Sequence, residues 1–234
     1  YSMLIYGKPK VGKTTFAVKN RDKTLLLATE IGYKGIPGVI ADPINSWGEF
    51  LQVLNQLKAD KAKDISAEKN GEKYETHFDT IVIDVVDILF DLCEKYVCSI
   101  KNVDEINQVP YGGGTKLVRK EFDEKLRSIV QMGYGLILIS HITFVGTEDD
   151  KKYATCSLSK TPLNIVTRLV DIYGYAETEV AEDGTKYWLH VRATPEYDAG
   201  TRLTYLPATL PLDFDKISKE VAIAVDKENA ADGL

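Results

Sequence analysis

Eight consecutive residues near the start of the chain have the spacing of a phosphate-binding loop. The pattern G-x-x-x-x-G-K-[ST] is met by Gly7-Lys8-Pro9-Lys10-Val11-Gly12-Lys13-Thr14. Its glycines let backbone N–H groups wrap a polyphosphate, and Lys13 would neutralise the β- and γ-phosphates. The hydroxyl of Thr14 suits a Mg²⁺ ligand. The motif therefore predicts that the residues from Gly7 to Thr15 bind ATP together with Mg²⁺.

The residues on either side of the loop favour the same interpretation. Residues 2–6 form an apolar run that leads directly into Gly7, and residues 13–20 have a helical pattern. This order of strand, loop and helix places the positive potential of a helix N-terminus beside the phosphates. An ordinary glycine turn is the alternative, and this context disfavours it.

Three polar residues stand where other apolar strands end. Asp84 directly follows residues 80–83, whereas Glu30 and His141 each follow a strand after one intervening residue. Because ligands bind at the carboxyl ends of parallel strands, Asp84 suits a Mg²⁺ ligand held through water. Asp87 is a rival for this role, but it lies one turn into the predicted helix. In the same way Glu30 suits a base for the attacking water, and His141 suits a sensor of the γ-phosphate. A capping role for Glu30 and a hydrogen-bonded core position for His141 are the alternatives.

Apolar runs and helical periodicities alternate over most of the chain. Strands are predicted at residues 2–6, 24–28, 80–83 and 134–139. Helices are predicted at residues 13–20, after the capping residues Ser46 and Glu49, after Asp84, at residues 115–132 and from Thr161. Alternation of this kind indicates an α/β fold with a mainly parallel central sheet flanked by helices.

The pattern changes in the last third of the chain. Residues 172–180 and 186–193 flank Glu182-Asp183-Gly184, which is a hairpin signal. A further strand is predicted at residues 202–206, and a last helix is predicted at residues 214–226. These elements indicate an antiparallel C-terminal β extension that is followed by a helix.

A chain of 234 residues fits one large domain with appendages, at roughly 150 residues per domain. We place the core at residues 1–212 and a C-terminal helix and tail at residues 213–234. Within the core, lysines alternate with acidic residues over residues 58–76, and Asn70-Gly71 is a turn signal. This pattern predicts a charged surface insertion shaped as a ragged hairpin, with a binding element as the alternative. Residues 142–160 show no clear period.

The overall composition excludes several classes of protein. Hydrophobic residues make up 44% and charged residues 27%, which is an ordinary globular mixture and not that of a disordered chain. A net charge of −6 argues against a globally basic nucleic-acid binder, so such contacts would need a local patch or several subunits. No apolar run reaches roughly 18 residues and no signal peptide is evident, so we expect a cytoplasmic protein without membrane contact. The three cysteines predict reduced, mostly buried thiols.

Four segments together resemble the RecA-like ATPase core. These segments are GKPKVGKTTFA, LLLATE, TIVID and LILISH. The chain is most similar to the phage ATP-binding proteins of the Sak group, which are RecA-like single-strand annealing proteins of recombination modules. The similarity covers most of residues 2–212 and includes Ser46-Trp47, Tyr111-Gly112 and the segment from Arg192 to Pro207. It implies the fold of a RecA-like P-loop NTPase.

The resemblance also implies roles for individual residues in ATP hydrolysis. Lys13 would act in catalysis through the phosphates, and Glu30 would match the catalytic glutamate of RecA-like ATPases. His141 would match the position that senses the γ-phosphate. Arg202 would be the arginine that is donated to the nucleotide of a neighbouring subunit. The implied assembly is a homo-oligomer, as a ring or a filament, with ATP at the subunit interfaces.

By the same resemblance, residues 142–160 would form a DNA-binding loop that faces the axis of such an assembly. Side chains suited to phosphate contact and base stacking are Lys151, Lys152, Tyr153 and Lys160. A solvated mobile loop is the alternative interpretation from the residues alone.

The leading hypothesis is therefore an ATP-hydrolysing recombination protein of a phage or prophage, placed in the cytoplasm of a bacterial host. Its partner would be single-stranded DNA, which it would anneal or pair. A P-loop kinase for a small molecule is the first alternative, but it needs an arginine-rich lid and the chain has six arginines. A nucleotide-sensing module that binds a replication or repair partner is the second, and it would not need Glu30 as a base.

Overall fold

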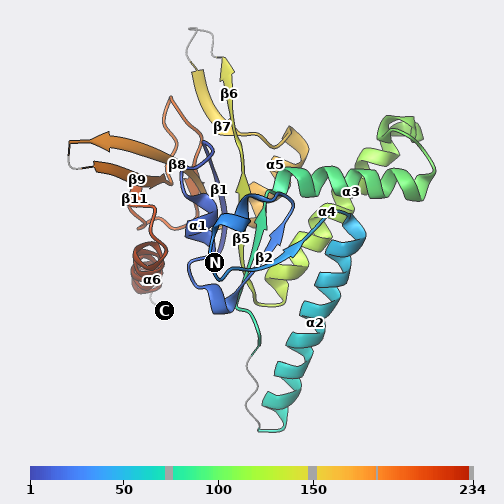
Figure 1. Cartoon of the computed structure of the whole chain (residues 1–234), viewed down its shortest axis with the longest axis horizontal. Coiled ribbons are helices and arrows are strands. Elements are labelled where there is room, and N and C mark those ends of the chain that lie inside the picture. The colour runs from blue at the N-terminus through green and yellow to red at the C-terminus, as the bar shows by residue number, and fades with distance from the viewer. Residues whose placement is uncertain (72–75, 147–151, 183, 232–234) are drawn as a thin grey trace. The chain divides into compact units, whose positions relative to one another are not determined.

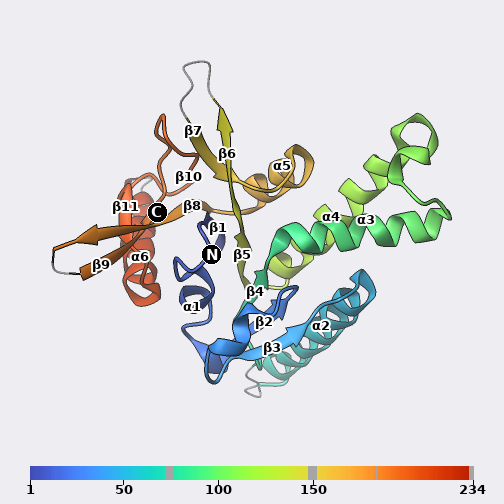
Figure 2. The same ribbon diagram turned by 45° about the horizontal axis from the view of Figure 1, so that its top comes forward.

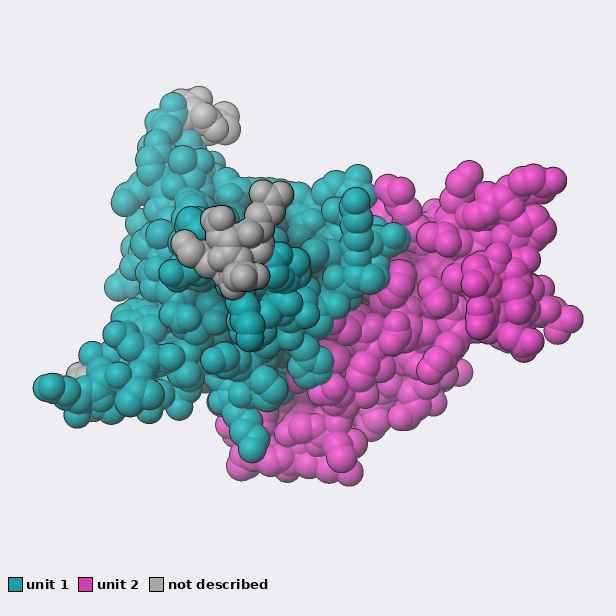
Figure 3. All heavy atoms as spheres, turned by 90° about the horizontal axis from the view of Figure 1, so that it is seen from above, with its two compact units in different colours: residues 1–19, 137–234 teal, residues 20–136 magenta. Residues whose placement is uncertain are grey.

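The computed structural model describes residues 1–71, 76–146, 152–182 and 184–231. The chain forms two compact units, which Figure 3 colours separately. Unit 1 consists of residues 1–19 and 137–234, and unit 2 consists of residues 20–136.

A sheet forms the centre of unit 1. Its strands are β1 (Ser2–Gly7), β5 (Gly135–Ser140), β8 (Ile172–Ala181), β9 (Gly184–His190), β10 (Gly200–Thr201) and β11 (Thr209–Pro211). The order is β11-β9-β8-β1-β5, and β10 pairs with β8. Strands β1 and β8 are parallel, whereas the pairs that involve β9, β10 and β11 are antiparallel. β1 is buried along its whole length, which its apolar side chains on both faces explain.

Helices and a separate hairpin complete unit 1 (Figure 1). Their bounds are α1 (Lys13–Ala17), β6 (Ile142–Gly146), β7 (Lys152–Cys156), α5 (Lys160–Leu169) and α6 (Phe214–Ala231). Strands β6 and β7 pair with each other in antiparallel fashion, apart from the main sheet. Helix α6 packs against β11 and buries Ile217, Val221 and Ala224.

Unit 2 joins parallel strands to long helices. Its strands are β2 (Thr24–Ala28), β3 (Ile40–Pro43) and β4 (Thr80–Asp84), in the order β4-β2-β3 and all parallel. Its helices are α2 (Trp47–Lys69), α3 (Val86–Lys101) and α4 (Gly113–Gln131). Helices α3 and α4 lie side by side (Figure 2). The Trp47 ring lies 4.8 Å from that of Phe50 and 6.1 Å from that of Phe122, so aromatic packing joins α2 to α4.

The structure confirms the predicted fold class. The pairs β1–β8, β2–β3 and β2–β4 are parallel, and the antiparallel pairs gather toward the C-terminal end of the sequence. The capping prediction also holds, because the Ser46 hydroxyl accepts a hydrogen bond from the Glu49 N–H at 3.2 Å. The three cysteine thiols are buried.

Residues 58–69 differ from their prediction, because they continue helix α2 and do not form a ragged hairpin. This stretch consists of lysine, alanine, acidic residues and other residues that a helix tolerates, and a Lys61–Asp64 ion pair of 3.8 Å lies along it. The helix ends at the predicted turn, where Gly71 has a φ of 71°. The rest of the predicted insertion, residues 72–75, lies outside the described residues.

Other predicted elements also need correction. Residues 202–206 form turns and not a strand, because the Arg192 guanidinium binds the carbonyl groups of Leu203 at 2.8 Å and Thr204 at 3.0 Å. The helix predicted at residues 13–20 ends at Ala17. Strand β3 was missed, because it is short and lies at an exposed edge of unit 2. Residues 142–160 contain the β6–β7 hairpin instead of a loop without period.

Candidate nucleotide-binding site

The predicted phosphate loop lies directly after β1 in unit 1. Its first glycine, Gly7, stands opposite Ala176 of β8. A Cβ atom at Gly7 would lie 2.2 Å from the carbonyl oxygen of Ala176, so a larger residue does not fit there. Gly12 has a φ of 94° and lies immediately before α1, in a conformation that favours glycine. The backbone therefore requires glycine at both positions, at Gly7 because of the close approach to β8 and at Gly12 because of the positive φ.

Lys13 is buried and holds the loop from inside. Its Nζ donates hydrogen bonds to the carbonyl oxygens of Gly7 at 2.8 Å and Lys8 at 3.0 Å. The ammonium group is thus fixed against the segment that would surround a phosphate. Helix α1 has only five residues, so its dipole contributes little. The positive potential of the site comes from Lys13 and from the backbone N–H groups of the loop.

The other predicted binding residues differ in exposure. Lys8, Pro9, Lys10 and Thr15 are exposed, Thr14 is half-buried, and Val11 anchors the loop in the core. The residues from Gly7 to Thr15 therefore run without a break from the last residue of β1, through the loop, into the first turn of α1.

Unit 2 carries the two predicted carboxylates at one edge of its strands. Ala28 of β2 stands beside Asp84 of β4, and Glu30 follows β2 after Thr29. The Thr29 hydroxyl accepts a hydrogen bond from the Val85 N–H at 2.7 Å and donates one to the Val85 carbonyl at 3.0 Å. This clasp fixes the ends of β2 and β4 beside each other. Sequence reasoning missed Thr29, although a hydroxyl between a strand and a candidate base was a usable signal.

His141 is half-buried in unit 1 between the end of β5 and the start of β6. Strand β5 neighbours β1, so His141 and the phosphate loop both follow adjacent strands. The His141 carbonyl accepts a hydrogen bond from the Ser157 N–H at 3.0 Å, which joins the residue before β6 to the residue after β7. Its role as a γ-phosphate sensor stays a prediction.

Arg202 takes part in an ion pair within unit 1. Its Nη1 lies 3.1 Å from Asp171 Oδ1, and its Nη2 also binds the Arg168 carbonyl. Asp171 in turn accepts a hydrogen bond from the Ser2 N–H at 2.9 Å, so the network joins the beginning of β1 to the segment before β8. The arginine side chain is 56% exposed. Its donation to a neighbouring subunit stays a prediction and would require loss of this pair.

Tyr6 joins the phosphate-loop strand to the hairpin. It directly precedes Gly7, and its hydroxyl lies 2.6 Å from the Asp198 carbonyl and 3.1 Å from the Ala154 carbonyl of β7. The Tyr173 hydroxyl accepts a hydrogen bond from the Cys156 N–H of β7 at 3.3 Å. Burial raises the pKa of both tyrosines well above the ordinary value, so they stay protonated and neutral. Strand β7 is therefore fastened to β1 and β8 by buried hydroxyl groups.

The predicted DNA-binding residues are only partly available on this hairpin. Lys152 is exposed on β7, and Lys160 is exposed but is the first residue of α5. Lys151 lies outside the described residues. Tyr153 is half-buried, and its hydroxyl is hydrogen-bonded to the Asp198 carboxyl group. Burial raises the pKa of the Asp198 carboxyl group, and the hydrogen bond from Tyr153 partly lowers it again. Tyr153 is thus engaged in a structural contact and is a poor stacking platform.

Phe144 is an aromatic residue of the hairpin that sequence reasoning missed. Phe144 stands opposite Ala154, and the residue is 49% exposed. Alternation along a strand puts Phe144 and Lys152 on the same face of the hairpin. The apolar run Ile142–Val145 directly after His141 was the signal in the sequence.

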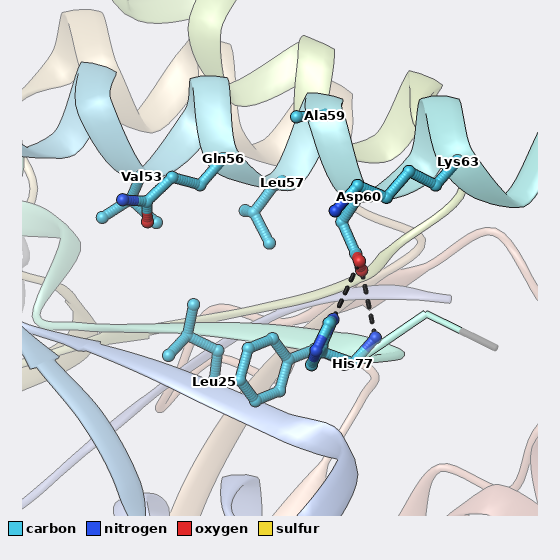
Figure 4. Close-up of a pocket in the computed structure, with 9 residues that line it drawn as sticks. Leu25, Val53, Gln56, Leu57, Ala59, Asp60, Lys63 and His77 are labelled. Atoms are coloured by element: carbon cyan, nitrogen blue, oxygen red, sulfur yellow. Dashed lines mark hydrogen bonds and ion pairs between the residues drawn. The ribbon is translucent and has the colours of Figure 1, made fainter.

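A different cavity, of about 370 Å³, lies in unit 2 beneath α2 (Figure 4). Its apolar wall includes Leu25, Val53 and Leu57, and Asp60 and His77 stand at its polar side. The His77 Nδ1 lies 2.8 Å from Asp60 Oδ1, and the His77 N–H donates to Asp60 Oδ2 at 3.0 Å. This double contact fastens the segment before β4 to α2. None of the predicted nucleotide-binding residues lines this cavity.

A glycine-lysine loop between a buried parallel strand and a helix, in an α/β fold, defines a P-loop nucleotide-binding protein. The sequence matches the family model described as AAA domain over residues 1–203, and the chain belongs to that family. It is accordingly a P-loop ATPase domain that binds nucleotide. Among the described residues, no helix is long and apolar enough to cross a membrane.

Individual similar proteins were also found. One is the SPbeta prophage-derived uncharacterized protein YorG of Bacillus subtilis (strain 168), which is 30% identical over 237 residues that cover 98% of this chain and 68% of that protein. The KaiC-like protein PH0186 of Pyrococcus horikoshii OT3 is 14% identical, with a TM-score of 0.43 and coverage of 86% of this chain and 82% of that chain. The flagellar accessory protein FlaH of Methanocaldococcus jannaschii is 13% identical, with a TM-score of 0.38 and coverage of 81% and 76%.

Proposed function

We propose that this ATPase belongs to a phage or prophage recombination system and acts on single-stranded DNA by annealing or strand pairing. The observation that carries the proposal is the contact between Tyr6, at the entrance to the phosphate loop, and the backbone of hairpin strand β7. It offers a direct mechanical link between a nucleotide and an exposed element that bears Phe144 and Lys152. The prophage origin of the B. subtilis relative and the resemblance to the Sak group support the same setting.

In this proposal the phosphate loop and the three polar residues after the strands have defined parts in hydrolysis. Lys13 and the loop N–H groups hold the β- and γ-phosphates. The Thr14 hydroxyl and the Asp84 carboxylate offer the oxygen ligands that Mg²⁺ prefers, and Asp84 would act through water. Mg²⁺, when bound, would neutralise phosphate charge. Glu30 orients and deprotonates the attacking water, and His141 reports the γ-phosphate to the hairpin that begins at the next residue.

The proposed assembly is a homo-oligomer with ATP at its interfaces, as a ring or a filament. Repetition of the hairpin along such an assembly would gather many weak DNA contacts, which a chain with a net charge of −6 needs. The direct test of the proposal is the rate of ATP turnover with and without single-stranded DNA. A rate that is the same in both conditions, for protein shown to bind ATP, would contradict the DNA-directed function.

Hairpin variants should weaken DNA binding in two distinguishable ways. Phe144→Ala should raise the Kd for single-stranded DNA by about 5- to 150-fold, because base stacking on an aromatic ring contributes about 1–3 kcal/mol. Lys152→Ala should lower the slope of log K against log salt concentration by about 0.7, since one phosphate contact is lost. Both effects are measurable by fluorescence anisotropy at several salt concentrations.

Matched controls come from the same unit. Tyr205 is 47% exposed and Lys219 is also exposed, and both lie outside the hairpin. Tyr205→Ala and Lys219→Ala should therefore leave the Kd and the salt slope as they are. If the control and the hairpin variants behave alike, the DNA site is elsewhere on the protein.

Tyr6→Phe should uncouple the nucleotide from the hairpin. The ring and its packing remain, but the hydroxyl bonds to Asp198 and Ala154 are lost. We expect ATP affinity to change by less than about threefold, while the stimulation of turnover by DNA falls several-fold. The free energy of unfolding should fall by about 1–2 kcal/mol, because the two hydrogen bonds of the Tyr6 hydroxyl are lost.

Tyr134→Phe provides the control for this stability loss. The Tyr134 hydroxyl donates to the Leu57 carbonyl at 3.1 Å in the core of unit 2. Its removal should cost a similar free energy of unfolding and leave DNA stimulation intact. An equal loss of stimulation in both variants would show that Tyr6 acts only through general stability.

A further inference from the structure

A second cavity adjoins the phosphate loop within unit 1 and has a volume of about 440 Å³. One wall is formed by Val11, Thr15 and Phe16, which belong to the loop and α1. The opposite wall is formed by Tyr187 of β9 and by Leu212 and Phe214, which lie between β11 and the first turn of α6. Figures 1 and 2 both show α1 beside this C-terminal part of the unit.

The cavity meets the phosphate loop at a defined end. In such loops the lysine reaches the β- and γ-phosphates, whereas backbone N–H groups hold the α- and β-phosphates. The cavity touches the loop at Lys10, Val11, Gly12 and Thr15, and Lys13 and Thr14 do not line it. A triphosphate whose terminal groups meet Lys13 would therefore direct its nucleoside end toward this cavity.

The walls have the character of a site for a flat aromatic ligand. The Phe16 and Phe214 ring centroids lie 5.8 Å apart and the rings are tilted by 55°, and residue Tyr187 is 45% exposed. A volume of about 440 Å³ lies in the range of small-molecule sites, roughly 300–1,000 Å³. Aromatic faces bind nucleobases by stacking, without a need for particular polar groups.

The far wall is also held rigidly. The Leu212 N–H donates to the Tyr187 carbonyl at 2.9 Å, which joins the segment after β11 to β9. The Asp213 carboxylate caps α6 by accepting a hydrogen bond from the Lys216 N–H at 3.0 Å. The near wall lies close to it, since a Cβ atom added at Gly12 would lie 3.9 Å from Leu212 Cδ2. Such preorganisation lowers the entropy that a bound ligand must lose.

We propose that this cavity binds the base and ribose of the nucleoside triphosphate, with Tyr187 and Phe214 as its aromatic contacts. The C-terminal segment from β9 to α6 is then part of the nucleotide site and not an appendage to it. The proposal rests on the ATP binding of the proposed function, and it adds the wall that recognises the nucleoside.

The test compares two ligands that share the phosphates. ATP and inorganic tripolyphosphate are titrated calorimetrically into the whole chain at the same Mg²⁺ concentration. Tyr187→Ala and Phe214→Leu should weaken ATP binding by about 5- to 150-fold, because each removes an aromatic stacking face. Both variants should bind tripolyphosphate with the parental affinity. Phe214→Leu keeps apolar packing against Phe16, so a folded variant is expected.

Tyr205→Ala is the matched control, since it removes an exposed tyrosine outside the cavity. It should bind both ligands as the parent does. An equal loss of ATP and tripolyphosphate affinity in the cavity variants, or no loss of either, would overturn the nucleoside pocket. Failure of the parent to bind either ligand would overturn the proposed function along with it.

Discussion

Lys13→Ala is expected to lower the rate of ATP turnover by about 10²–10³-fold, which is the usual cost of removing one preorganised charged donor from a transition state. In the structure its Nζ is buried and already oriented by the carbonyl groups of Gly7 and Lys8. Phosphate oxygens in the loop would meet this ammonium group without rearrangement of the backbone. Steady-state turnover, measured together with ATP affinity, checks the prediction.

The same contacts give Lys13→Ala a second expected effect. Two hydrogen bonds from a charged donor are lost, so the free energy of unfolding should fall by about 1–3 kcal/mol. Lys8 provides the control, because it lies in the same loop but is exposed. Lys8→Ala should keep most of the turnover and the stability. A folded Lys13→Ala protein that hydrolyses ATP at the parental rate would show that Lys13 has no catalytic role.

The parts of the site that the sequence predicted are those encoded by neighbouring residues. The phosphate loop is one contiguous motif, so its glycines and lysine fix the local path wherever the chain goes afterwards. Asp84 and Glu30 were found because each follows a buried apolar strand, and parallel strands end at a common edge. The clasp by Thr29 was missed, since a threonine after a strand does not reveal which backbone groups its hydroxyl will meet.

The parts that could not be predicted depend on contacts between distant residues. Tyr6 and Asp198 are separated by most of the chain, and the sequence around neither residue predicts the hydrogen bond between them. Arg192 prevents the segment after Arg202 from forming a strand by binding several of its carbonyl groups. The sequence predicts that Tyr153 stacks on bases, but in the structure its hydroxyl is hydrogen-bonded to the side chain of Asp198. Tertiary hydrogen bonds overrode local propensity in each case.

Glu30→Gln is expected to lower kcat by about 10²–10⁴-fold while ATP affinity changes only a few-fold. A carboxylate can accept a proton from water, whereas an amide of the same shape cannot. Glu30 is exposed and follows β2 at the strand edge that also carries Asp84. A single-turnover measurement of hydrolysis, with a separate binding titration, distinguishes loss of chemistry from loss of affinity.

The proposed DNA function adds a consequence that separates an active ATPase from a passive binder. When hydrolysis is slow the ATP-bound state persists, so the complex of Glu30→Gln with single-stranded DNA should dissociate more slowly than that of the parent. Asp84→Asn should behave differently, because loss of a Mg²⁺ ligand weakens Mg²⁺-dependent nucleotide binding as well as the rate. If Glu30→Gln hydrolyses ATP at the parental rate, Glu30 is a loop residue without a catalytic role. The water-activating carboxylate would then have to be sought at Asp87, in the first turn of α3, by the same pair of measurements.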